Sequence, residues 1–232
     1  MGFNPNMREI WKEFNHKSLP IEHWQGRIRE ELLYSWHRSR NYQIDPYQNH
    51  CDKVLNNYDL KKRIDDNITL LNASEALMQK LHQHLKTSDL VMVLADSEGC
   101  LLRITGNNRL ISFLSKGNFI EGAFWNEKTV GTCAIGLCSH LKKPVSVMGF
   151  EHYLFCAGTS SCCASPIHNP EGRVIGILDL TGKIENVSKQ TLSLACATSY
   201  AIEQQLLLHS IRQNLTLSDF YLRELKIGRA HV

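Results

Sequence analysis

The segment of residues 151–163, EHYLFCAGTSSCC, concentrates side chains that can do chemistry. An acid, a histidine, a tyrosine and three cysteines lie within these thirteen residues. Such a set could ligate a metal ion, supply a reactive thiol, or line a cavity that binds a small molecule. The spacing of the residues, and the elements that carry them, bear on the choice.

A metal site is the first alternative, with His152, Cys156 and Cys162 as its candidate ligands. Their spacing is not the C-x2-C pair of a structural zinc module, and no second pair of that kind follows. Cys162 and Cys163 are adjacent in a predicted strand, so their side chains point to opposite faces of the sheet. The two thiols therefore cannot both bind the same metal ion.

A reactive thiol is the second alternative. It needs a partner that stabilises the thiolate, and His152 or His140 could supply one. No nucleophile elbow accompanies the cysteines, so we do not expect an enzyme; a methionine-sulfoxide reductase, which would use cysteines at such a cavity, is the enzymatic alternative. Most of the eight cysteines, Cys100 and Cys196 among them, fit a role as small buried apolar side chains.

A cavity wall is the third alternative. His152 lies between an acid and an aromatic residue, just after a predicted strand and before a run of small residues. That composition is typical of a loop lining a cavity rather than of a solvated surface. A structural hydrogen bond would explain His152 equally well.

Composition excludes several function classes. The chain has 232 residues and a net charge of +3 from 26 basic and 23 acidic residues that are interspersed, so we expect no nucleic-acid binding. No apolar run approaches the ~20 residues that cross a bilayer, and the N-terminus does not resemble a signal peptide. We expect a cytoplasmic protein without a membrane segment, whose thiols are reduced. Phosphate-binding motifs are absent, which argues against an ATPase.

Hydrophobic periodicity predicts an α+β fold with a mostly antiparallel sheet. Residues 44–64 are polar and are expected to be a connection. The expected elements are helices over residues 23–42 and 65–86, a hairpin over 89–96 and 100–106, helices over 107–114 and 128–141, strands over 143–149, 160–167 and 172–182, and a long helix over 188–221.

The last helix is too long for a small domain. About 30 residues would extend about 45 Å at 1.5 Å per residue. Its apolar positions between Ala195 and Leu217 have no obvious cover within the chain. We therefore expect this stripe to pair with a second copy in a homodimer.

Four segments in order resemble the sensory regions of bacterial sigma-54-dependent activators of the acetoin-catabolism and dihydroxyacetone-operon type. They are LYSWHRSRNYQIDP at 33–46, FIEGAFWNEKTVGTCAIG at 119–136, EHY at 151–153, and CCASPI with GRVIGILDLTG at 162–167 and 172–182. The resemblance implies a GAF-like, PAS-related domain whose antiparallel sheet is flanked by helices, and it covers about residues 27–210.

This resemblance implies a regulatory domain, not an enzyme, that needs no cofactor. It implies a small-molecule effector, and a full-length protein with an AAA+ ATPase domain that acts on sigma-54 RNA polymerase. The expected division is an N-terminal helical region at 1–64, a sensor domain at 65–187, an output and dimerisation helix at 188–225, and a linker start or expression scar at 226–232.

The expected ligand-binding residues come from the same segments. They are Phe124, Trp125, Thr132, Cys133, Glu151, His152, Tyr153 and Cys162. Two positions depart from the family pattern, because Cys133 replaces an asparagine and Ser160 replaces a tryptophan. A thiol-redox or metal sensor using Cys133, Cys156, Cys162 or Cys163 is therefore an alternative, and a purely protein-binding module is another.

Overall fold

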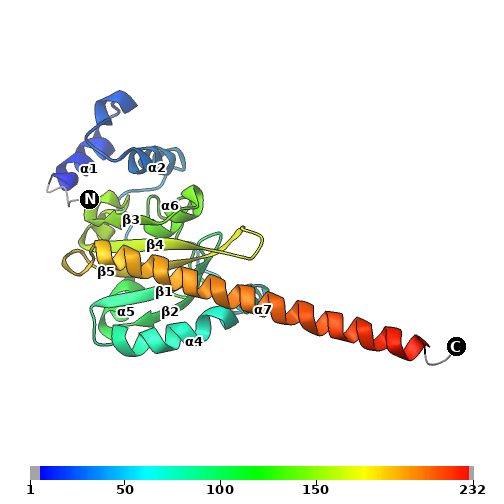
Figure 1. Cartoon of the computed structure of the whole chain (residues 1–232). Helices are drawn as coiled ribbons and strands as arrows, with labels where there is room; N and C mark the ends of the chain where they lie inside the picture. Colours follow the sequence, from blue (N-terminus) through cyan, green and yellow to red (C-terminus); the bar gives the residue numbers. More distant parts are fainter. Residues whose placement is uncertain (1–5, 230–232) are drawn as a thin grey trace.

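The computed structural model describes residues 6–229, with side chains to residue 216 (Figure 1). Its helices are α1 (Met7–His16), α2 (Glu30–Asn41), α3 (Asn57–Asp66), α4 (Ile68–Leu85), α5 (Asn108–Leu114), α6 (Ala134–Leu141) and α7 (Lys189–Arg229). The strands are β1 (Leu90–Asp96), β2 (Leu101–Gly106), β3 (Val145–Met148), β4 (Ser160–His168) and β5 (Val174–Lys183). Short 3₁₀ turns η3 (Gly149–Glu151) and η4 (Phe155–Thr159) lie between β3 and β4.

The five strands form one sheet in the order β2-β1-β5-β4-β3, and every neighbouring pair is antiparallel. This arrangement confirms the predicted α+β fold and the hairpin of β1 and β2. At the centre of the sheet, Asp179 of β5 lies between Val93 of β1 and Ala164 of β4. Cys162 of β4 lies opposite Thr181 of β5.

The two faces of the sheet are covered by different elements. Alternate residues of β1 and β5, such as Met92 and Leu180, pack against α4 and α7. The residues between them, such as Val93 and Ile177, pack on the opposite face, where α6 and the N-terminal helices complete the core. Because side chains alternate along a strand, each central strand contributes to both layers.

The N-terminal helices share the core of the second face. Trp11 of α1 and Trp36 of α2 are fully buried, and their indole nitrogens donate hydrogen bonds to the carbonyl oxygens of Tyr153 and Glu151. Figure 1 shows α1 and α2 beside β3 and α6. The division of the chain at residue 64 stays a proposal, since the hydrophobic core is continuous across it.

The expected N-terminal helical region at 1–64 contains two helices, α1 and α3, whose positions the sequence did not predict. The expected connection over residues 44–64 is wrong in its second half, because α3 begins at Asn57 with Asn56 as its cap. None of the residues of α3 is buried, so it has no apolar stripe to reveal it. Helix α1, by contrast, buries Met7, Ile10, Trp11 and Phe14 at helical spacing.

The predicted helix over 128–141 is too long, since α6 begins only at Ala134. Gly131 has a φ of +66°, which a right-handed helix does not contain, so no helix runs through this residue. A Cβ atom at Gly131 would lie 2.6 Å from the side chain of Tyr153. Gly136 lies inside α6, where an added Cβ would lie 2.7 Å from the Glu127 nitrogen. The two glycines therefore permit the close backbone contacts that the sequence suggested.

Helix α7 has 41 residues and runs across the sheet before it extends past the rest of the molecule (Figure 1). Its first part buries Ala195, Ile202 and Leu206. It continues past the expected end at residue 221, and the side chain of Leu217 is outside the described set. No helix in the described part of the chain is long and apolar enough to cross a membrane.

Candidate functional site

A cavity of about 270 Å³ lies on the face of the sheet opposite α7. Its floor comes from β4 and β5, and its walls come from the start of α6, the end of α5 with the residues after it, and the segment from His152 to Ser160. Most of its surface is apolar. The lining residues include Phe113, Leu114, Phe119, Trp125, Cys133, Ala134, Ile135, His152, Cys156, Ala157, Ser160, Cys162, Asp179 and Thr181.

Four of the eight expected ligand-binding residues line this cavity: Trp125, Cys133, His152 and Cys162. The other four, Phe124, Thr132, Glu151 and Tyr153, are not among its lining residues.

Each of these four is engaged elsewhere. The ammonium nitrogen of Lys53 lies over the ring of Phe124, 4.0 Å from the ring centroid. Tyr153 is buried against Gly131. Thr132 and Glu151 are held by groups on or beside α2. The motif segments therefore contain two kinds of residue, and only one kind faces the cavity.

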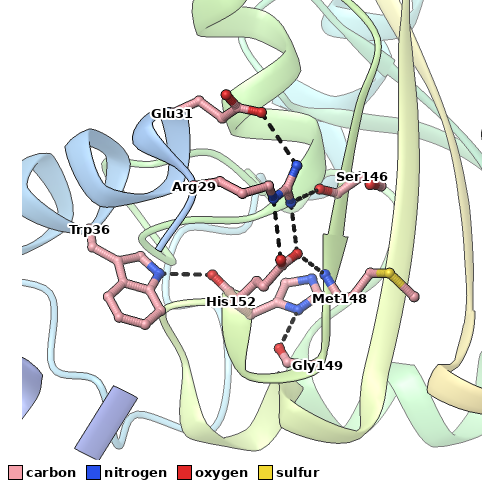
Figure 2. Close-up of polar contacts among 8 residues, drawn as sticks. Arg29, Glu31, Trp36, Ser146, Met148, Gly149 and His152 are labelled. Atoms are coloured by element: carbon pink, nitrogen blue, oxygen red, sulfur yellow. Dashed lines mark hydrogen bonds and ion pairs between the residues drawn. The ribbon is translucent and has the colours of Figure 1, made fainter. Parts of the chain in front are cut away.

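His152 is 3% exposed, and its Nδ1 lies 2.9 Å from the carbonyl oxygen of Gly149 (Figure 2). Burial lowers the pKa of His152 to about 4, although the Gly149 contact opposes this. The ring is therefore neutral near pH 7, with Nδ1–H donating to Gly149. That tautomer leaves Nε2 as a hydrogen-bond acceptor. His152 therefore both makes a structural hydrogen bond and lines the cavity.

Asp179 is the ionisable group in the cavity floor that the sequence analysis did not select. It is 1% exposed, and its Oδ2 accepts a 2.5 Å hydrogen bond from the Thr181 hydroxyl. Burial raises the pKa of Asp179 to about 7, while the Thr181 bond opposes the rise. One signal was available in the sequence: an acid in the middle of the apolar strand GILDLTG.

The cavity thiols are not activated. Burial raises the pKa of Cys133 and of Cys162 well above the ordinary value, and Asp179 raises both further. A thiol in such surroundings stays protonated and is a poor nucleophile. Cys163 points to the other face of the sheet, opposite Leu180 on β5, as the strand alternation predicts.

The alternative metal ligands His152, Cys156 and Cys162 all line the cavity. Even so, no group of three or more histidine, cysteine, aspartate or glutamate side chains suited to a metal ion occurs among the described residues.

Cys133 has a second role, because it caps the first turn of α6. Its Sγ accepts a hydrogen bond from the backbone nitrogen of Gly136 at 3.4 Å. The asparagine typical of this position in the resembling family would be a stronger cap than a thiol. Replacement by cysteine therefore changes a helix cap as well as the cavity wall.

A set of polar contacts, here called the α2 clasp, joins α2 to the two loops that border the cavity. It comprises Arg29, Ser35, Trp36 and Arg38 with Glu127, Thr132 and Glu151.

In the first half of the clasp, Arg29 Nη2 lies 2.8 Å from Glu151 Oε2 and 2.7 Å from the carbonyl oxygen of Ser146. The backbone nitrogen of Met148 donates to the same carboxylate at 2.8 Å. Figure 2 shows Arg29 at the centre of these contacts, with Glu31 on its other side. This half fixes the backbone that immediately precedes His152.

In the second half of the clasp, Arg38 contacts Glu127 through two nitrogens, at 2.6 and 2.7 Å. The Ser35 hydroxyl donates to Glu127 at 2.5 Å and lies 2.6 Å from the Thr132 hydroxyl. Glu127 and Thr132 are both buried, and the chain enters the cavity wall at the next residue, Cys133. The clasp is thus satisfied internally and leaves its acids no unpartnered oxygen.

Comparison with known proteins gives one family match and several relatives. The sequence profile of the family described as MimR, N-terminal domain, matches residues 25–204. The acetoin dehydrogenase operon transcriptional activator AcoR of Bacillus subtilis (strain 168) is 32% identical over 217 residues, which are 94% of this chain and 35% of that protein. The propane 2-monooxygenase operon transcriptional activator MimR of Mycolicibacterium smegmatis is 26% identical over 199 residues, 85% of this chain and 33% of that protein.

Among solved structures, the Escherichia coli DhaR(N)–DhaL complex contains a chain that matches with a TM-score of 0.77 at 20% identity. The match covers 84% of this chain and 65% of that one, and it supports the fold. The chain spans about a third of the length of the curated relatives AcoR and MimR.

Proposed function

Because the chain belongs to the family of MimR N-terminal domains, we propose that it is the sensory region of a sigma-54-dependent transcriptional activator and binds a small-molecule effector in its cavity. The relatives named above are transcriptional activators of operons, which supports a regulatory rather than an enzymatic role. One observation carries the proposal: a mainly apolar cavity that contains a few polar groups and lies beside the hydrophobic core. Such cavities are the usual form of small-molecule sites.

The strands that form the cavity floor also contact the proposed output helix. Cys162 and Asp179 face the cavity, while neighbouring residues of β4 and β5 face α7. On β4, the carbonyl oxygen of Ser165 accepts a hydrogen bond from Ser199, and His168 pairs with Glu203 at 2.7 Å. An effector that shifts these strands would shift the contacts of α7. A relay to an AAA+ domain requires that the effector bind the two arrangements of α7 with different affinity.

Helix α7 also supports the proposal of a homodimer. Leu207, Leu208, Ile211 and Leu215 are each at least 41% exposed where the helix leaves the sheet. Leu206 is not part of this row, because it is buried in the core. Ile211→Asp combined with Leu215→Asp should therefore give monomers in light scattering and leave the fold intact. A persistent dimer would place the interface on another surface.

Acetoin is the first effector to test, since the AcoR relative activates an acetoin dehydrogenase operon. Native mass spectrometry should detect acetoin bound to the wild-type chain and released on denaturation. Cys162→Leu should weaken binding, because the larger side chain projects into the cavity. Cys163→Val is the matched control, since this neighbouring side chain faces away from the cavity.

The outcomes of this experiment separate the alternatives. Equal binding by all three proteins would place the acetoin site outside the cavity. A retained metal mass instead of an organic one would support a metal sensor. If neither acetoin nor the aromatic probes described below bind to the wild-type chain, the effector proposal is contradicted.

A further inference from the structure

Asp179 differs from the other deeply buried carboxyl groups of this chain. Asp96 is 3% exposed and pairs with Arg63 at 2.5 Å, and Glu127 is 6% exposed and pairs with Arg38. For Asp179, no salt bridge to a basic side chain exists among the described residues. An unpaired buried charge is costly, so ionisation of a carboxyl group in this position lowers the stability of the fold.

The two oxygens of Asp179 have different surroundings. Oδ2 accepts the hydrogen bond of Thr181, whereas Oδ1 has no hydrogen-bond partner among the described residues. The side chain lines the cavity and is 1% exposed. Buried polar atoms are almost always satisfied, so an unsatisfied oxygen at a cavity wall is a specific sign of a missing partner.

The groups that face Asp179 are not cations. Cys162 comes from β4, and Cys133 and Cys138 come from the start and the middle of α6. His152 lines the same cavity and is neutral near pH 7. Lys116 also lines the cavity, but it is exposed. An anionic ligand would therefore meet no buried positive charge.

We propose that Asp179 is the anchoring residue of the cavity and that it selects uncharged ligands that carry a hydroxyl or carbonyl oxygen over anionic ones. This inference rests on the proposed effector site. In its protonated form, Asp179 donates a hydrogen bond from Oδ1 to the ligand oxygen. His152 Nε2 offers an acceptor for a ligand hydroxyl in the same cavity. A protonated carboxyl beside a neutral imidazole thus recognises a neutral polar group.

The size of the cavity guides the choice of probes. An engineered cavity of about 150 Å³ holds benzene, so about 270 Å³ can hold a benzene ring with a small substituent. Benzyl alcohol, benzamide, benzoate and benzylamine share a ring and differ in the polar group. They compare a neutral hydroxyl, a neutral amide, an anion and a cation at nearly constant size.

The experiment measures the affinity of these four probes by calorimetry for the wild-type chain, Asp179→Asn, Asp179→Leu and the control Leu178→Val. Leu178 is on the same strand but faces α4 and α7. We expect benzyl alcohol and benzamide to bind the wild type at least tenfold more tightly than benzoate does. Asp179→Leu should weaken the two neutral probes about tenfold, whereas Asp179→Asn and Leu178→Val should stay within about threefold, because asparagine keeps a donor.

A pH series adds a readout that a merely structural role would not move. The affinity of the wild type for benzaldehyde, whose oxygen can only accept a hydrogen bond, should fall as pH rises from about 6 to about 8, because Asp179, with a pKa of about 7, loses its donor proton. The affinity of Asp179→Asn should not change over this range. Thermal unfolding of each variant establishes that it is folded.

The failures are distinguishable. Binding of neutral probes that is equally strong in Asp179→Leu would overturn the anchoring role and leave the effector cavity intact. Benzoate or benzylamine as the tightest probe would overturn the selection of neutral ligands. Absence of binding by all four probes to the folded wild type would count against the effector cavity itself, and this inference would fall with it.

Discussion

The α2 clasp and the cavity hold two different kinds of buried polar group, although they meet at adjacent residues. Glu151 belongs to the clasp, where Arg29 and the backbone of Met148 satisfy its carboxylate. His152 belongs to the cavity, where only Nδ1 has a structural partner. Similarly, Thr132 contacts Ser35 while Cys133 lines the cavity. Sequence adjacency therefore does not separate structural from cavity-facing residues, whereas the hydrogen bonds of Glu151 and His152 show how these two neighbours differ.

The motif segments thus combine structural residues with residues that line the cavity. A polar side chain whose partners are all supplied by the protein contributes to folding, and its removal leaves the partners unsatisfied. A buried polar atom that lacks a partner and lies at a cavity wall can pair with a group inside the cavity. On this basis Glu127, Thr132 and Glu151 position the cavity walls, and His152 and Asp179 face the cavity.

The largest loss of stability at a fixed pH should come from breaking the clasp at Glu127. Glu127→Ala leaves the partly buried guanidinium of Arg38 and the hydroxyl of Ser35 without their acceptor. We expect the free energy of unfolding to fall by about 3 kcal/mol, as for other buried pairs that lose one partner. Chemical denaturation measures the loss.

The control for Glu127 is Glu9→Ala, which removes the exposed pair with Lys12. An exposed ion pair contributes about 1 kcal/mol or less. Equal effects of the two substitutions would show that the clasp is not the structural element described above.

The second effect concerns Asp179 and depends on pH. Because the folded pKa is raised to about 7 from 3.8, the wild type loses stability as pH rises between these values. Asp179→Asn lacks this loss, so its stability relative to the wild type should increase by up to about 1.4 kcal/mol per pH unit across the window. The opposite contribution of His152, whose lowered pKa reduces stability as pH falls from 6.5 towards 4, is common to both proteins and cancels in the difference.

Urea denaturation of both proteins at several pH values measures this effect. A difference that does not vary with pH would mean that Asp179 is ionised in the folded chain, and the contrast between clasp and cavity would then lose its basis.

The third prediction compares adjacent residues. His152→Ala should weaken binding of benzyl alcohol about tenfold, since it removes the hydrogen-bond acceptor in the cavity. Its effect on the free energy of unfolding should be smaller than that of the substitution at Glu151. Glu151→Gln should lower the free energy of unfolding by about 1–2 kcal/mol and change binding less, because it weakens the pair with Arg29. Calorimetry and denaturation on the same samples test both. Reversed phenotypes would assign ligand contact to Glu151.

The smallest effect is expected at Cys133, where the helix cap and the cavity wall coincide. Asparagine is a better N-cap than a thiol, so Cys133→Asn should raise the free energy of unfolding by up to about 1 kcal/mol. A loss of stability would show that the volume of the side chain in the cavity wall matters more than its capping bond. Thermal unfolding is sensitive enough to decide.

The sequence predicted the sheet well because its strands are short apolar runs bounded by turn residues, as in DLVMVLAD before DSEG. It did not predict α3, which buries nothing, or the late start of α6, which follows from the backbone at Gly131. His152 and Cys162 were selected because of their types and neighbours. Asp179 was not selected, because its position in the cavity floor and the missing partner of its Oδ1 depend on strand pairing that only the folded chain defines.

The most direct test of the account is a titration of the chain, labelled at isoleucine methyl groups, with acetoin and benzyl alcohol by nuclear magnetic resonance. Ile135 lines the cavity, while Ile10 and Ile28 pack among the N-terminal helices near the clasp. We expect a saturable shift of the Ile135 methyl group and little change at the other two. Shifts at Ile10 or Ile28 with an unchanged Ile135 would contradict it, because the ligand would then bind at the clasp rather than in the cavity.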